Sequence, residues 1–457
     1  MTTTSAGLSR RQMLMAAIGG LGSLAFANMC AAATLGDERP LAPKPPHFQP
    51  RAKRVIFLCM RGGPSHVETF DYKPQLNADN LKHGRRSGCK LFGSQWKFSQ
   101  HGESGLWISE LFPQVAKQAD RLCVIKSMHT DNENHAPALE QLHTGSFQFV
   151  RPSIGSWSLY GLGTENANLP GFIAISPITA LGGSRYYSSA FLPAAYQATT
   201  LGESGKSIKK AQLSNLSSPR LDAAAQRQQL DLLQALNRDF AEAQPGDTRF
   251  AGIVDAHELA FRMQGEFPQV MDLARESKAT LDMYGINGSP TDEFGRQCLL
   301  ARRFSEAGVR FVEITHADWD HHGFVSTGMP ARAKEIDQPI AGLLSDLAQR
   351  GLLEDTLVFW GGEFGRSPDD PTQDGRGHNS LGFTVWLAGG GVRGGMAYGN
   401  TDEHGYEAVE NKVHLHDLHA TMLHLIGLDH ERLTYRHAGR DFRLTDVHGR
   451  VVQEIIA

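Results

Sequence analysis

Short apolar runs without polar alternation recur along the chain. They occupy residues 54–60, 121–126, 310–314, 356–360 and 383–388. Continuous apolar runs of this length are typical of strands that are buried on both faces of a parallel sheet. We therefore interpret all of them as strands of one buried sheet.

Helical patterns lie between and after these runs. Residues 333–347 carry apolar side chains at helical spacing, and Gly351 follows them. Residues 417–427 show the same spacing and end in Gly427. Glycine after the last periodic position is a common helix stop. Strands that alternate with helices predict an α/β sandwich with a mostly parallel central sheet flanked by helices.

The N-terminus has the features of an export signal. Arg10 and Arg11 precede an apolar run over residues 13–27, and small residues follow up to Ala33. This order predicts a twin-arginine signal peptide over residues 1–33 and a proline-rich linker over residues 34–52. The run is too short for a comfortable membrane span, and no later run is long enough. We expect a periplasmic or extracellular chain with no stable membrane span after signal removal.

The remaining sequence, residues 53–457, is interpreted as a single domain. A polar segment rich in Gln, Ala and Leu, around residues 203–250, is predicted to be a helical insertion. Cys59 and Cys123 lie in apolar runs and are expected in the core. No cysteine pair has CxxC spacing, and the sequence establishes no disulfide.

Composition narrows the class of protein. The 457 residues are 40% hydrophobic and 21% charged, with a formal net charge of -4. These values are typical of a globular chain. They do not suggest the concentrated basic face that nucleic acid binding requires, so we expect no nucleic acid partner.

Candidate chemistry lies directly after the apolar runs. In open α/β sheets, ligands bind at the carboxyl ends of the strands. Asp320 and His322 follow the run at 310–314, and Glu363 and His378 follow the run at 356–360. Two carboxylates and two imidazoles form a mixed ligand set that zinc or manganese accepts. Asp318 is an alternative ligand, and a hydrogen-bonded polar loop without metal is the alternative interpretation.

Several segments resemble the sulfatase and alkaline-phosphatase superfamily. Residues 343–366 and 413–429 resemble two of its helix and strand patterns. More closely, the chain resembles an exported bacterial family within it, the domain of unknown function 1501. The motifs that carry this resemblance are GGPSHxxTFDxKP at 62–74, NHxPAxxxxxTG at 134–145, LLARRFSEAGVRFVEI at 299–314, WDHHG, GGEFGR and GRGHN.

The resemblance implies an alkaline-phosphatase-like sandwich and the hydrolysis of sulfate or phosphate esters at one or two metal ions. Asp320 and His322 match the loop that binds the first metal in the superfamily. Glu363 matches its strand-end Asp, and His378 matches its later histidine. We expect a divalent metal (zinc, manganese or calcium) and a sulfated or phosphorylated small molecule or polysaccharide as substrate.

Two positions depart from the superfamily pattern. Phe364 stands where the superfamily has His or Asn, and it cannot bind a metal. Arg61, Gly62 and Gly63 stand where the first strand usually supplies a metal-binding Asp. His66 and Asp71 are candidate substitutes for that Asp.

The candidate reacting and binding groups follow from the same alignment of motifs. His135 occupies the position of the usual nucleophile, and histidine can act as a phosphoryl nucleophile or a general acid–base. Ser65 is a rival nucleophile, although a helix or turn cap is the preferred interpretation. Arg61, Asn134 and Arg366 are predicted to bind the anionic substrate. His414 and His416 precede the last helix and are further candidates for the same site.

Two functions are therefore open. The first is an exported, metal-dependent hydrolase of sulfate or phosphate esters. The second is a non-catalytic relative that binds an anionic ligand, a glycan or an envelope protein partner. The missing first-strand Asp and the Phe364 replacement motivate the second.

Overall fold

The computed structural model describes residues 40–179, 182–211, 221–243 and 248–457. The predicted signal over residues 1–33 lies outside these ranges, as do parts of the predicted linker and insertion. The described part of the linker lies against the domain: the Lys44 N–H donates to Leu162 O (3.0 Å) and the Ala52 N–H donates to Leu425 O (2.8 Å).

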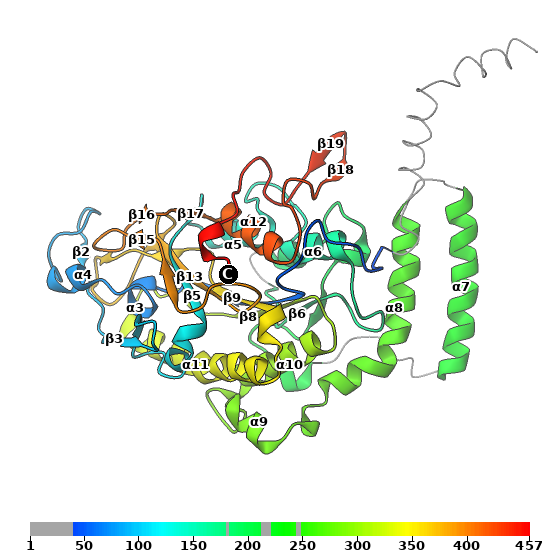
Figure 1. The fold of residues 1–457 in the computed structure, drawn as a ribbon, viewed down its shortest axis with the longest axis horizontal. Coiled ribbons are helices and arrows are strands. Elements are labelled where there is room, and N and C mark those ends of the chain that lie inside the picture. Colours follow the sequence, from blue (N-terminus) through cyan, green and yellow to red (C-terminus); the bar gives the residue numbers. More distant parts are fainter. Residues whose placement is uncertain (1–39, 180–181, 212–220, 244–247) are drawn as a thin grey trace, which may run out of the picture.

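A nine-stranded sheet forms the centre of the molecule (Figure 1). Its strands are β1 (Arg54–Met60), β5 (Leu122–His129), β6 (Phe172–Ile175), β7 (Thr199–Leu201), β8 (Phe311–His316), β9 (Thr356–Gly361), β13 (Phe383–Ala388), β14 (Met396–Tyr398) and β17 (Val413–His414). Their order is β14-β5-β13-β9-β1-β8-β6-β7, and β17 pairs with β5 beyond β14. Among these strands only β13 runs against the others. The predicted mostly parallel α/β sheet is confirmed.

The sheet register explains why distant segments meet. Met60 of β1 lies opposite His316 of β8, and Cys59 lies opposite Gly361 of β9. The polar segments that follow β1, β8 and β9 therefore leave the sheet at one edge. Because β13 is antiparallel, the segment that precedes it, which contains His378, returns to that same edge.

Helices cover both faces of the sheet (Figure 1). One face packs against α5 (His135–Thr144), α6 (Ile154–Leu162) and α12 (Leu415–Leu425), and the other packs against α10 (Asp292–Glu306) and α11 (Val325–Gln349). Alternate residues of β1 supply the two cores: Ile56 and Leu58 face α10 and α11, whereas Phe57 and Cys59 face α5 and α12. This alternation is the two-residue period of a strand that is buried on both faces.

The predicted helices lie within these elements, although their ends differ. The pattern at 333–347 belongs to α11, which begins earlier, at Val325. The pattern at 417–427 belongs to α12, which spans Leu415–Leu425 and has its C-cap at Ile426.

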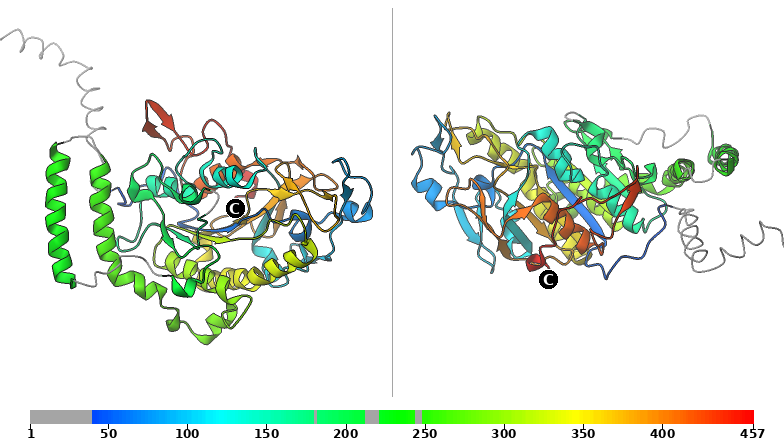
Figure 2. Two further views of the ribbon diagram at one scale, coloured as in Figure 1. Left: turned by 180° about the vertical axis from the view of Figure 1, so that it is seen from behind. Right: turned by 90° about the horizontal axis from the view of Figure 1, so that it is seen from above.

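The predicted insertion contains α7 (Ala223–Ala243) and the start of α8 (Thr248–Met271), which lie side by side next to the main body (Figure 2). Arg227 of α7 makes a bidentate contact with Glu258 of α8 (2.7 and 2.9 Å). Three short helices are α3 (His66–Thr69), α4 (Pro74–Ala78) and α9 (Lys278–Met283).

Five two-stranded sheets complete the described structure. They pair β2 (Lys90–Leu91) with β11 (Asp369–Asp370), β3 (Phe98–His101) with β4 (Leu106–Ser109), β10 (Gly365–Arg366) with β12 (His378–Asn379), β15 (Asn400–Thr401) with β16 (Ala408–Glu410), and β18 (Tyr435–His437) with β19 (Arg440–Phe442). Cys59, Cys89, Cys123 and Cys298 are free and buried. Within the described ranges, no helix has both the length and the apolar character that a membrane span requires.

Candidate metal centre

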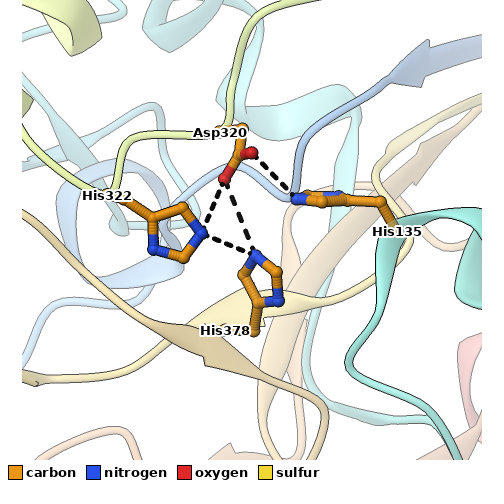
Figure 3. A group of neighbouring side chains, drawn as sticks. All are labelled: His135, Asp320, His322 and His378. Atoms are coloured by element: carbon orange, nitrogen blue, oxygen red, sulfur yellow. Dashed lines mark hydrogen bonds and ion pairs between the residues drawn. The ribbon is translucent and has the colours of Figure 1, made fainter.

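Four side chains converge at the carboxyl edge of the sheet (Figure 3). His135 is the first residue of α5, Asp320 and His322 lie in the loop after β8, and His378 begins β12. One ligand atom from each of these residues lies within 4.8 Å of the others. The structure thus brings together three of the four predicted metal ligands and the predicted catalytic histidine.

Three donor atoms form a compact triangle. Asp320 Oδ1 lies 3.2 Å from His322 Nε2 and 3.6 Å from His378 Nε2, and the two Nε2 atoms are 2.9 Å apart. Ligands bound to a tetrahedral zinc at about 2.1 Å lie about 3.4 Å from one another. The triangle therefore matches the size and the donor chemistry of a divalent metal site.

His135 contacts the other oxygen of the same carboxylate. Its Nε2 lies 3.1 Å from Asp320 Oδ2, and its Nδ1 lies 2.6 Å from Glu363 Oε1. Glu363 is fully buried and accepts the Gly62 N–H at both oxygens (3.0 and 3.2 Å). Glu363, a predicted ligand, therefore lies behind His135, where it holds the Nδ1–H and leaves Nε2 directed at the cluster.

The ionisation of the cluster reflects these contacts. Burial opposes protonation of His135, but its contacts with Asp320 and Glu363 outweigh this effect and raise its pKa to about 9. Burial also opposes ionisation of Asp320, but the contacts from His135 and His378 and the charge of Arg366 hold its pKa well below the usual range. Burial and the Arg366 charge lower the pKa of His322. Asp320 is thus anionic and His322 is neutral near pH 7, the forms that bind metals.

Arg366 lies beneath the cluster, at 1% exposure. Its guanidinium donates to Asp320 Oδ1 (2.7 Å) and to the carbonyl groups of Gly62, Gly63 (3.0 Å) and Arg376 (3.2 Å). A guanidinium held by four acceptors fixes the turn after β1 and one oxygen of Asp320. The sequence predicts that Arg366 binds the substrate. In the structure Arg366 is buried beneath the four clustered side chains, and its guanidinium is already bonded to protein acceptors.

The glycines after β1 allow two loops to approach closely. Gly62 has φ +114°, and a Cβ at this position would lie 2.6 Å from Asp320 N. Only glycine accommodates both this backbone conformation and this contact. The segment that lacks the superfamily Asp therefore supplies a backbone N–H to Glu363 and space for the loop that carries Asp320.

Phe364, the second departure, forms a wall of the site. Its ring lies 4.8 Å from the ring of His135 and 4.7 Å from that of His378, and it is 1% exposed. The side chain that cannot bind a metal instead packs against two histidines and restricts their orientation.

The remaining predicted groups lie around or away from the cluster. Arg61 contacts Asp318 (3.6 Å), and both line a neighbouring cavity of about 490 Å³. Asn134 is exposed at the N-cap of α5, without a side-chain cap hydrogen bond. Ser65 occupies the N-cap of α3, but its buried Oγ makes no cap bond and has no partner among the described residues.

The candidate substitutes for the missing Asp lie outside the cluster. Nε2 of His66 bonds to Gly405 O (2.8 Å), and Asp71 pairs with Lys73 (3.1 Å). His414 and His416 belong to a different group, together with Asp131.

Sequence reasoning missed one buried group entirely. His143 of α5 lies 3.0 Å from Glu313 of β8, and Cys59 of β1 is the third member. The detectable signal was Glu313, a charged residue inside an apolar run. All three are buried, so this trio belongs to the core between sheet and helices.

Comparisons with known proteins give one family and several similar structures. The family model described as "Protein of unknown function (DUF1501)" matches residues 52–456. No curated protein matches the sequence. Similar crystal structures include the lipoteichoic acid synthase LtaP from Listeria monocytogenes (9% identity, 90% of this chain and 80% of that chain, TM-score 0.37). Others are the PsFucS1 sulfatase from Pseudoalteromonas sp. (13%, 83% and 68%, 0.35) and the alkaline phosphatase from the Antarctic bacterium TAB5 (10%, 74% and 92%, 0.29).

Proposed function

The chain belongs to the DUF1501 family of proteins of unknown function. We propose that it is a metal-dependent hydrolase of sulfate or phosphate esters. The observation that carries the proposal is the donor triangle of Asp320, His322 and His378, with a histidine–glutamate pair directly beside it. A metal site next to an oriented acid–base group is the arrangement that metal-assisted hydrolysis requires.

Asp320, His322 and His378 would hold the metal. Three protein ligands leave a coordination position for substrate, as in catalytic zinc sites, and the mixed N/O set also suits manganese. Asp320 and His322 are 43% and 56% exposed, so the site is open to a substrate from solvent. When bound, the cation would polarise the ester oxygens and, by its charge, favour the neutral form of the neighbouring His135.

His135 would act as the general base. With its Nδ1–H held by Glu363, neutral His135 presents the Nε2 lone pair to the cluster. It can accept a proton from the attacking water at Nε2 and return it to the leaving oxygen. The buried Glu363 carboxylate stabilises the imidazolium that forms between these two events.

Arg61 is the group best placed to bind the anionic substrate. It is 24% exposed, follows β1 directly and lines the cavity of about 490 Å³. Asp318 also lines that cavity, and it precedes the metal-binding candidate Asp320 by two residues in the chain. We propose that a sulfated or phosphorylated small molecule or polysaccharide enters through it.

We also propose that this chemistry takes place in the periplasm or outside the cell. The support is the Arg10-Arg11 pair and the apolar run that follows it. Replacement of both arginines by lysine should leave the protein in the cytoplasm. Export at the wild-type level would contradict the twin-arginine route.

A non-catalytic anion-binding function is the second candidate, and one observation favours it. Arg366 already lies 2.7 Å from Asp320 Oδ1 and compensates the carboxylate that a metal would need. This alternative predicts that binding of inorganic sulfate or phosphate survives chelation, with no turnover. An envelope protein or a glycan as ligand belongs to the same alternative.

Metal content and turnover decide between the two. The purified exported protein should contain at least one equivalent of zinc or manganese per chain and hydrolyse a generic aryl sulfate or aryl phosphate. Asp320→Asn should lose one equivalent of metal together with turnover, whereas His83→Asn, a change at an exposed histidine outside the site, should lose neither. Metal-free wild-type protein with an intact fold and no turnover would overturn the hydrolase proposal.

A further inference from the structure

A second group of metal-ligating side chains lies where β5 meets α12. Asp131 follows β5, His414 ends β17, and His416 lies in the first turn of α12. The parallel pairing of His414 with His129 brings β17 and the end of β5 together. One ligand atom from each of Asp131, His414 and His416 lies within 4.8 Å of the others. None of these residues belongs to the group around Asp320.

The second group contains one carboxylate, and one of its two imidazoles contacts that carboxylate. Nε2 of His414 lies 3.1 Å from Asp131 Oδ2. The rings of His414 and His416 are 4.9 Å apart. The ring of His129 lies 5.0 Å from that of His414, and the ring of His448 lies 5.2 Å from that of His416. Such dense packing of imidazoles disfavours their protonation, and neutral imidazole is the form that binds metals.

His416 is buried without a complete set of partners. It is 5% exposed, and its Nδ1 has no hydrogen-bond partner among the described residues. A buried polar atom without a partner is costly, so such an atom needs an explanation in a stable fold. Burial lowers the pKa of His416 to about 3, so the ring is neutral near pH 7. Protonation to the imidazolium therefore does not explain the unpartnered Nδ1 atom.

Solvent reaches this group through a cavity. Asp131 and His416 line a cavity of about 250 Å³ together with three arginines, Arg151, Arg440 and Arg443. Two of these arginines are compensated, because Arg440 contacts Asp446 and Arg443 lies 3.4 Å from Glu431. These two ion pairs reduce the positive charge that an entering cation meets in the cavity.

We propose that Asp131, His414 and His416 form a second site for a divalent transition metal of the zinc class. The two imidazoles and one carboxylate repeat the donor chemistry of the Asp320 triangle. Coordination through Nε2 of His414 requires the proton to sit on Nδ1. The hydrogen bond that Nδ1 now accepts from the His416 N–H (3.2 Å) is then lost, and the start of α12 adjusts.

Metal stoichiometry tests this proposal. Chelator-stripped wild-type protein, titrated with Zn²⁺ and measured by elemental analysis after desalting, should bind two equivalents per chain. Asp131→Asn and His414→Asn should each bind one equivalent. Asn at position 414 retains a side-chain oxygen that can accept the capping hydrogen bond, which limits the effect on α12. His83→Asn, with its exposed histidine, is the matched control and should bind two.

A variant of the first site separates this proposal from the proposed function. His322→Asn should retain the equivalent that Asp131→Asn loses, and the double variant should bind none. If Asp131→Asn and His414→Asn, with thermal unfolding unchanged, bind as much Zn²⁺ as the wild type, the second site does not exist. If wild type binds one equivalent and Asp131→Asn removes it, the second site stands and the Asp320 site fails.

Discussion

The Nδ1 atom of His135 lies 2.6 Å from Oε1 of Glu363, a carboxylate with no exposed surface. The same carboxylate accepts the backbone N–H of Gly62, so its position is fixed from two sides. A buried anion of this kind sets the tautomer of the imidazole and stabilises its protonated form. The acid–base behaviour of the site should therefore depend on Glu363, which has no contact with solvent.

Replacement of Glu363 by Gln should lower kcat by about 10- to 100-fold. The amide oxygen can still accept the Gly62 N–H, but the negative charge beside His135 is lost. The pKa of His135 should fall, because its contact with Glu363 is one of the causes that raise it. The pH profile of kcat, measured with an aryl ester, should shift its acidic limb to lower pH. An unchanged profile would show that Glu363 does not act through His135.

His135→Gln should strongly reduce turnover but retain the metal. General acid–base groups contribute about 10²- to 10⁴-fold, so kcat should fall within that range. The metal affinity should stay near the wild-type value, because His135 faces Oδ2 of Asp320 whereas the other two histidines contact Oδ1. Zn²⁺ titration of the two proteins checks this. A large loss of affinity would make His135 a fourth ligand.

The stability of the metal-free protein should decrease at alkaline pH. The pKa of His135 is about 9 in the folded protein and about 6.5 in an unfolded chain. A group whose folded pKa is raised stabilises the protein fully below pH 6.5, and this stabilisation is lost as the pH rises through 9. The change should be less than about 3 kcal/mol, because solvent screens a partly exposed pair. Urea denaturation of chelator-treated protein at pH 6, 7.5 and 9 measures it, and His135→Gln should flatten the dependence.

Much of the fold and part of the site could be predicted from the sequence. Buried strands have a continuous apolar signal, so the runs at 54–60 and 383–388 have the same bounds as β1 and β13. The start of α11 was missed because Gly328 and Pro330 interrupt its first turns with poor helix formers, although Val325, Met329 and Ala333 are buried at helical spacing. At the site, strand ends indicated Asp320 and His322, but the sequence does not say which oxygen faces which imidazole.

The role of Glu363 shows the limit of motif reasoning. Its match to a metal-binding Asp concerns its position at a strand end, whereas its contacts depend on where the Gly62 N–H and the His135 ring lie. Those two groups come from segments about 230 to 300 residues away in the chain. Such contacts are set by tertiary packing, which one sequence does not specify.

Gly62→Ala should disrupt the metal centre. A Cβ at this position would meet the backbone of Trp319 and Asp320 at 2.6–2.9 Å, and φ is +114°. Backbone strain alone costs about 1–3 kcal/mol, and displacement of the 318–320 loop should also weaken Zn²⁺ binding. Gly288→Ala is the matched control, since φ is also positive there (+147°) and no atom lies within 4 Å of the added Cβ. Equal metal affinity in the two variants would mean that the Gly62 contact does not position Asp320.

Arg61→Gln should weaken the binding of anionic substrates without affecting the chemical step. Arg61 lines the cavity beside the metal centre and is not among the four clustered side chains. A charged contact made equally to substrate and transition state raises KM and leaves kcat unchanged. Loss of a contact with a charged group costs about 1.5–3 kcal/mol, which corresponds to an increase in KM of about 10- to 150-fold. Arg436→Gln removes an exposed arginine on β18 and should leave both constants unchanged. If Arg61→Gln lowered kcat and left KM intact, Arg61 would instead contact charge that develops only in the transition state.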